Sequence, residues 1–214
     1  MISFGVFKYF LGYIFKSRTR QRLITLSIVG LLISSFSLVV LQGVMGGLQN
    51  GLVTRSKLAL GVGYFDVTNF EKEKILELEK LLEDRDIIFS REIELELMVK
   101  HQNYIAPMII HGVDFKKFVP RFLGHKDKTG LVIGGDLGRN LRAFFGSDIT
   151  ITSPAHTQIL MQEIPRYSKT LVTDFYSSEL PEVDGVHGWV RIEFLQNLIR
   201  KRKINRIRFF DQDI

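Results

Sequence analysis

The chain of 214 residues is long enough for one sizeable domain or two small ones, and 45% of its residues are hydrophobic. It contains no cysteine, which excludes disulfide bonds, thiolate metal sites and cysteine catalysis. The formal net charge is +6, with much of the excess at the two ends. A basic balance of this size fits nucleic acid, anionic lipid or no specific partner.

An uncharged segment near the N-terminus is the most informative feature. From Leu23 to Thr54 there is no charged residue, and these 32 residues would span about 48 Å as a helix, whereas the hydrocarbon core of a membrane is roughly 30 Å thick. We expect a transmembrane helix over residues 23–58 that extends beyond the bilayer. A cleaved signal peptide is the alternative, but its apolar core is usually about 7–15 residues long.

The flanks of this helix predict its orientation. Five basic residues and no acidic one precede it: Lys8, Lys16, Arg18, Arg20 and Arg22. Only Arg55 and Lys57 follow closely. The positive-inside rule therefore places residues 1–22 in the cytoplasm and residues 59–214 outside. Within the first segment, residues 4–15 have the pattern of a helix in the cytoplasmic interface, or of a simple aromatic and basic flank.

Three glycines of the helix, Gly43, Gly47 and Gly51, are four residues apart and share one face. Small residues in such a stripe let a neighbouring helix approach closely in lipid. The spacing favours a partner helix. The alternative is that glycine loosens the helix near its exit from the membrane.

The outer segment has strand and helix patterns in alternation. Ile93, Leu95, Leu97 and Val99 alternate with polar residues, the period of a half-buried strand. We expect strands at residues 64–68, 93–100, 104–113, 131–133, 148–152, 169–175, 187–191 and 206–210, helices at 71–82, 136–145 and 192–203, and a short apolar run at 87–90. Hairpins among these elements predict an α+β fold, a mixed α/β extracytoplasmic domain after the transmembrane helix, rather than a fully parallel sheet.

Three residues mark expected boundaries. Asp136 is placed to cap the helix that follows it. Pro107 should weaken the strand at residues 104–113 or put it on an edge, and Pro154 should stop the strand at 148–152.

The sequence contains no catalytic signature. The stretch 124–130 is bounded by glycines but lacks the Gly-Lys-Ser/Thr ending of a P-loop, so we expect ATP hydrolysis, if it is needed, in a separate subunit. No two of the five histidines form a ligand pair at helical spacing, and we expect no metal, no cofactor and no catalytic residue. The strongest charge feature is a basic run: Arg200, Lys201, Arg202, Lys203, Arg206 and Arg208. Outside a membrane it would meet anionic lipid or an acidic partner rather than nucleic acid, or form a solvated face.

Six stretches, in order, resemble landmarks of lipoprotein-releasing ABC transporter permeases of the LolC/LolE type, which are related to MacB. The stretches are the basic residues 13–22, the helix exit Val-Met-Gly-Gly-Leu-Gln at 44–49, Leu60-Gly61, the strand 106–114 that ends in Gly-Val-Asp, residues 130–154 from Gly-Leu-Val-Ile-Gly to Ser-Pro, and residues 183–198. Gly46 stands where the family often has asparagine, and His111 where it has arginine.

The resemblance implies an outer domain of the MacB-like periplasmic type on a bacterial inner-membrane permease. Such permeases pair with a second permease subunit, the same or a paralogue, and with a cytoplasmic ATPase. They pass lipoprotein cargo from membrane lipid to a periplasmic carrier. The chain ends at Ile214, before the family's later membrane helices, so we expect a fragment, a truncated product or a polypeptide completed by another.

The resemblance also implies two contact sites. Val44, Met45 and Leu48 would meet the lipoprotein near the helix exit. A hook after the Ser-Pro landmark, in residues 155–167, would bind the carrier through five residues: Ile159, Leu160, Met161, Pro165 and Arg166. The alternative function is a single-pass membrane-anchored scaffold or regulatory protein with a periplasmic ligand-binding domain. FtsX-like division permeases share the anchor but not the later landmarks.

Overall fold

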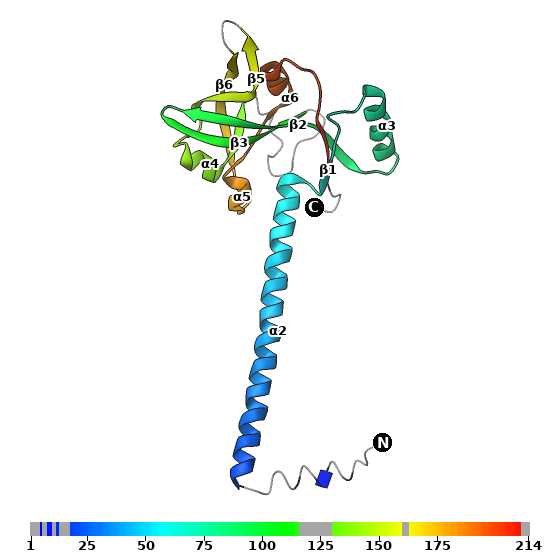
Figure 1. Cartoon of the computed structure of the whole chain (residues 1–214), viewed down its shortest axis with the longest axis vertical. Coiled ribbons are helices and arrows are strands. Elements are labelled where there is room, and N and C mark those ends of the chain that lie inside the picture. The colour runs from blue at the N-terminus through cyan, green and yellow to red at the C-terminus, as the bar shows by residue number, and fades with distance from the viewer. Residues whose placement is uncertain are drawn as a thin grey trace. The chain divides into compact units, whose positions relative to one another are not determined.

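The computed structural model describes Gly5, Lys8, Tyr9, Gly12 and residues 18–115, 130–159 and 163–210. Most of the expected interfacial segment at residues 4–15 lies outside this set. Contacts divide the chain into two compact units, residues 1–51 and 52–214. Helix α2 (Arg18–Leu60) starts in the first unit and ends in the second (Figure 1).

The second unit is a mixed α/β domain, as the sequence predicts. Its described elements are β1 (Gly63–Asp66), α3 (Lys72–Glu83), β2 (Ile88–His101), β3 (Tyr104–Val113), β4 (Leu131–Gly134), α4 (Gly135–Asn140), β5 (Asp148–Ile159), β6 (Glu163–Tyr176), α5 (Pro181–Asp184), β7 (His187–Arg191), α6 (Ile192–Ile199) and β8 (Arg206–Phe210). The strands form one sheet in the order β1-β8-β2-β3-β7-β4-β6-β5, in which parallel and antiparallel pairs both occur.

Six of these strands close into a ring. The additional pairing of β2 with β5 joins the two ends of the series β2-β3-β7-β4-β6-β5. Strand β2 makes this closure because it is long: its first residues pair with β8 and its last with β5, while β3 runs along its other edge. The result is a six-stranded barrel with β8 and β1 as an extension.

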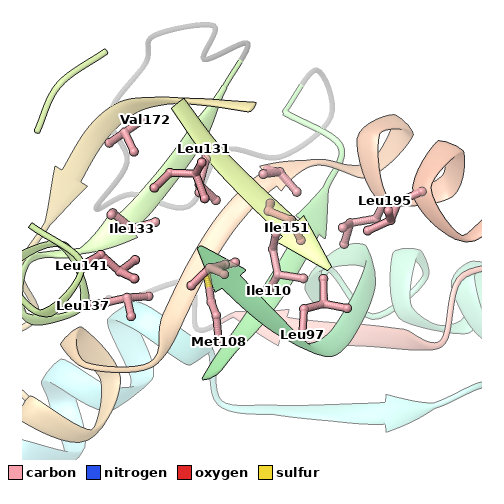
Figure 2. Packing of buried hydrophobic residues seen from close by; sticks show 14 of the residues in the cluster. Leu97, Met108, Ile110, Leu131, Ile133, Leu137, Leu141, Ile151, Val172 and Leu195 are labelled. Atoms are coloured by element: carbon pink, nitrogen blue, oxygen red, sulfur yellow. The ribbon is translucent and has the colours of Figure 1, made fainter. Parts of the chain in front are cut away.

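The barrel interior is apolar. Figure 2 shows side chains from β2 to β6 converging, with Leu137 and Leu141 at α4 and Leu195 of α6 completing the cluster. Leu131, Ile133 and Ile151 are fully withdrawn from solvent. Burial of apolar area stabilises a fold by roughly 25 cal/mol per Å², so we expect this cluster, which has the most members of the three that the structure describes, to contribute most to the stability of the domain.

The extension forms a second, smaller core. Val67, Leu82 and Ile207 pack under α3, with Phe89 and Phe209 partly buried beside them. The buried Glu79 of α3 forms an ion pair with Arg91 of β2, N–O 2.5 Å, which fastens the polar side of the helix to the sheet.

Three expected helix boundaries are wrong. Helix α4 is capped by Gly134, and Asp136 instead pairs with Arg139 within the first turn. Helix α4 ends at Asn140 because residues 141–146 turn back. Gly146 has φ +83°, a left-handed conformation that glycine adopts easily because it has no side chain. Helix α6 ends at Ile199, since Arg200 adopts φ +53°, so the basic residues that follow lie in a loop and not on a helix.

Pro154 does not stop β5. The pairing of β5 with β6 shifts between Ser153 and Thr157. Pro154 lies in this bulge, where its missing backbone N–H interrupts no hydrogen bond of the ladder. Pro107 behaves as expected, because β7 pairs with β3 only from Ile109 onward and leaves the proline with one neighbouring strand.

Candidate functional site

Helix α2 is the described helix that is long and apolar enough to cross a membrane, over Arg22–Leu60. Its apolar side chains are exposed along the span, as a lipid-facing helix requires. Val44, Met45 and Leu48, the expected lipoprotein contacts, are each more than half exposed. Open space surrounds Gly43, Gly47 and Gly51, where an added methyl group would meet no atom within 4 Å.

The end of α2 is held by the outer domain. Ala59 is buried in a cluster with Val113 and Trp189. Gly61 adopts φ +72° and its N–H donates to the Lys57 carbonyl oxygen at 2.8 Å, the left-handed cap that ends many helices. The landmark Leu60-Gly61 is therefore the point where the membrane helix stops and the sheet begins.

Arg208 of β8 completes this cap. One of its Nη atoms donates to the carbonyl oxygen of Leu60, which the helix itself leaves without a partner. A cation at the C-terminal end of a helix also opposes the helix dipole. Arg208 is itself buried, so it needs carboxylate partners.

Those partners belong to a row of polar side chains on the outer face of the sheet, which we call the polar ladder: Arg206 and Arg208 of β8, Glu92 and Glu94 of β2, His111 of β3 and His187 of β7. Arg208 donates to Glu92 through Nε and to Glu94 at 2.7 Å. Arg206 donates to Glu94 at 2.5 Å. The ladder links four strands and the end of α2.

The histidines continue the ladder. His111 Nδ1 bonds the second oxygen of Glu92, and His111 Nε2 lies 2.7 Å from His187 Nδ1. The His111 ring is stacked on Trp189, with centroids 4.9 Å apart. Apart from Glu94, Arg206 and His187, the members are almost fully buried, with Glu92 2% and His111 1% exposed.

Two pKa values of the ladder depart from their ordinary range. Burial alone would raise the pKa of Glu92. His111 and Arg208, through their charges and their hydrogen bonds to the carboxylate, instead lower this pKa to about 2. Burial, together with the neighbouring His111 and Arg208, lowers the pKa of His187 to about 4. At neutral pH, Glu92 is therefore ionised and His187 is uncharged.

The ladder also presents a metal-like grouping. Glu92, Glu94 and His111 offer ligand atoms within 4.8 Å of one another. Both carboxylates, however, already accept hydrogen bonds from Arg208, whose guanidinium charge would repel a cation placed there. Two carboxylates and two guanidiniums balance within the group, so we interpret it as an ion-pair network and assign it no metal.

Sequence reasoning missed the ladder because its members are far apart in the chain. A signal was present: Glu92 and Glu94 are two residues apart in β2, and Arg206 and Arg208 are two residues apart in β8. Matching charges at period two predict strands that pair on one face. His111 and His187 had no such signal.

The expected carrier hook lies on the hairpin of β5 and β6. Leu160 and Met161 lie outside the described residues, as does the side chain of Ile159. Pro165 is exposed, while Arg166 is half-buried and donates to the carbonyl oxygen of Ile199 at 2.6 Å. Arg166 therefore packs against the end of α6, which makes it a support of the hairpin.

At the base of this hairpin, Ser153 Oγ lies 2.8 Å from His156 Nδ1. A catalytic serine would need a third group to orient the histidine. In the described part of the chain no acidic residue bonds His156, and burial together with the nearby Lys201 and Arg166 lowers its pKa. We interpret this pair as a hydrogen bond that steadies the bulge.

Other landmark residues also have structural roles. Asp184 is buried and accepts hydrogen bonds from the Ser178 backbone at 2.7 Å and from its hydroxyl at 2.6 Å, which shapes the turn before α5. An added methyl group on Gly112 would lie 2.8 Å from Leu195, so this glycine allows α6 to approach β3.

The structure splits the basic run in two. Arg206 and Arg208 enter the polar ladder, whereas residues 200–203 form an exposed loop after α6. Arg202 and Lys203 line a cavity of about 390 Å³ beside α3.

No protein-family model matches the chain, and no curated protein sequence does. Among solved structures, the chain is similar to the extracellular domain of the noncanonical ABC-type transporter YknZ from Gram-positive bacteria. The identity is 10%, the TM-score is 0.41, and the match covers 69% of this chain and 78% of that one.

Proposed function

We propose that the chain is a permease subunit, or the N-terminal part of one, of an ABC transporter that extracts lipoproteins from the bacterial inner membrane and passes them to a periplasmic carrier. In this proposal the N-terminus is cytoplasmic and residues 59–214 are periplasmic. ATP is hydrolysed by a separate cytoplasmic subunit, and a second permease subunit completes the cargo path.

The observation that carries the proposal is the cap on α2. A transporter that drives an outer domain from the cytoplasm needs a membrane helix that continues into that domain. Helix α2 runs without a break to Leu60, and Gly61 and Arg208 fix its last turn to the sheet. The landmark Leu60-Gly61 falls on this cap, and two residues of later landmarks, Gly112 and Asp184, lie at a close contact and at a turn of the outer domain.

Orientation is testable because the chain has no cysteine of its own. Ser17→Cys and Asn103→Cys introduce single thiols before α2 and at the exposed tip of the β2–β3 hairpin. In intact spheroplasts, an impermeant maleimide should label position 103 and not position 17. The reverse pattern would refute the proposed topology.

Partners are testable by purification from membranes. The tagged full chain, extracted in mild detergent, should carry an ABC ATPase and bound lipoprotein. Recovery of neither, from cells that express the neighbouring genes, would favour the membrane-anchored scaffold. Deleting residues 158–163 should abolish capture of a periplasmic lipoprotein carrier while the ATPase is retained, which separates the hook from assembly.

Helix packing has a matched pair of variants. Gly47→Leu fills the glycine stripe, and Gly46→Leu adds the same volume about 100° around the helix. Cross-linking of α2 to a partner helix in membranes should fall for Gly47→Leu and persist for Gly46→Leu. Equal cross-linking yields for the two variants would mean that the three glycines make the helix flexible and do not pack against a partner helix.

A further inference from the structure

The cavity beside α3 has an apolar floor. It lies between α3 and α6 and has a volume of about 390 Å³, within the range of small-molecule pockets. Val67 and Ile192 are buried at its base, and Ile75 and Ile204 are half-buried there.

Large apolar side chains also reach the mouth of the cavity. Phe70 is 45% exposed and Leu76 is 52% exposed, and both line it. An apolar ligand would cover these groups as well as the floor, and removal of such surface from water is favourable.

The rim of the cavity is basic. Lys72, Arg202 and Lys203 line it, are exposed, and form no ion pair with any residue that the structure describes. Arg91, the fourth basic lining residue, is already held by Glu79. Asp114 is the single acid among the described lining residues, so the rim has an excess of positive charge.

The backbone explains why the charges gather here. Arg200 adopts φ +53° and ends α6, so the chain leaves the helix and carries residues 202–203 to the cavity. Had α6 continued through Lys203, as its sequence suggests, these cations would lie on a solvated helix face.

A second cavity provides an internal contrast. It has a volume of about 620 Å³ and is also lined by two lysines, Lys100 and Lys169. Its other lining is mainly polar, with Phe144 as its single large apolar side chain among the described residues. Basic residues therefore meet an extended apolar floor at the first cavity and not at this one.

We propose that the cavity between α3 and α6 binds a single-chain anionic amphiphile, with its acyl chain on the apolar floor and its carboxylate or phosphate head at Lys72, Arg202 and Lys203. Charge complementarity selects the head, and the apolar floor selects the chain. The site is independent of the proposed transport function, because it uses neither α2 nor the hook.

Photolabelling of the full chain in lipid nanodiscs tests the site. A dodecanoate with a terminal diazirine is photolysed in the sample, and adducts are located by mass spectrometry of peptides. We expect adducts in residues 67–76 and 192–204. Adducts confined to residues 23–58, or spread evenly over the domain, would overturn the proposal.

The head group is tested with probes of the same chain length. Dodecyl phosphate and dodecanoate should both compete for labelling, and their relative strength identifies the natural head. A diazirine dodecylamine should label at least about tenfold less, since each charge-assisted hydrogen bond is worth about 1.5–3 kcal/mol. Equal labelling by the amine, or competition by an acidic peptide but not by dodecanoate, would refute an amphiphile site.

Matched charge reversals complete the test. Arg202→Glu with Lys203→Glu should reduce labelling about tenfold, and Leu76→Asp should reduce it by placing a carboxylate at the apolar mouth of the cavity. Lys100→Glu with Lys169→Glu makes the same charge change at the second cavity and should leave labelling unchanged. Near-UV circular dichroism of Trp189, the one tryptophan in the sequence, reports whether each variant is folded. Equal losses in both double variants of intact fold would show a general charge effect and overturn the site.

Discussion

The barrel interior and the outer face of strands β8, β2, β3 and β7 are both withdrawn from water, but by different means. The interior is packed with apolar side chains, such as Leu131 and Ile151. The outer face holds the polar ladder, where Glu92 is as buried as many core residues. An apolar group in the interior loses only packing when a neighbour is removed, whereas a buried charge loses the partner that makes its burial tolerable.

Replacing Arg208 by methionine should produce the largest effect. It leaves Glu92 buried without its guanidinium and frees the Leu60 carbonyl, and breaking such a pair costs about 3–5 kcal/mol. Urea unfolding of the full chain in detergent, followed by Trp189 fluorescence, measures the loss. Adding Glu92→Gln should recover more than about 1 kcal/mol, because the unpaired charge is gone. A double variant no more stable than Arg208→Met would show that the ion pair is not the source of the cost.

The interior should respond without such a rescue. Ile151→Ala removes buried methylene and methyl groups and leaves a cavity, at a cost of about 2–4 kcal/mol by the same assay. Ile105→Ala, on an exposed side chain of β3, is the control and should change stability by less than about 0.5 kcal/mol. Similar losses for both would mean that the barrel interior is not the main core.

The sequence predicts the interior better than the ladder, for a physical reason. Apolar runs are visible along the chain itself, and β3, β7 and β8 have the bounds that the sequence predicts. The ladder depends on which strands are neighbours, and His111 meets His187 only because β3 pairs with β7 in parallel. Boundaries failed where tertiary contacts overrode local signals, as at Pro154, where a bulge with β6 lets β5 continue.

The same distinction divides the candidate sites. The membrane-spanning character of α2 can be predicted from the sequence, since an uncharged run of this length is typical of a transmembrane helix. The cavity beside α3 could not be predicted from the sequence, because Phe70, Leu76 and Lys203 are brought together only by the end of α6 and the packing of α3 on the sheet.

The joint between α2 and the ladder can be tested by one methyl group. At Gly61, with φ +72°, an added Cβ would overlap the Phe209 carbonyl oxygen, so Gly61→Ala should destabilise the domain by about 1–3 kcal/mol. At Gly63 the nearest atom would be 3.8 Å away, and Gly63→Ala should be within about 0.5 kcal/mol of the parent. If both variants melt at the temperature of the parent protein, a side chain at position 61 causes no strain in the cap, and the cap does not require glycine there.

The ladder should also make stability depend on pH. The pKa of His187 is about 4 in the fold and 6.5 in the unfolded chain, so the unfolded state binds the extra proton between these values. Stability should therefore be full above pH 6.5 and fall as the pH drops toward 4, by about 1–2 kcal/mol after allowance for the partial exposure of the ring. His187→Gln should flatten this interval. A slope unchanged in the variant would assign the dependence to other groups.

The smallest effect is expected where an ion pair is exposed. Arg55 of α2 and Glu179 are joined at 2.6 Å, yet their side chains are 48% and 67% exposed. Water and salt screen such a pair, so Glu179→Gln should cost less than about 0.5 kcal/mol in the urea assay, and less still in high salt. Glutamine keeps the backbone hydrogen bond from Glu179 to Asp184, so the variant isolates the charge. Arg208 and Arg55 both connect the end of α2 to the outer domain, and burial is the property that separates them. A loss for Glu179→Gln comparable with that for Arg208→Met would mean that the attachment depends on charge alone, and the distinction between the buried ladder and the surface pair would fail.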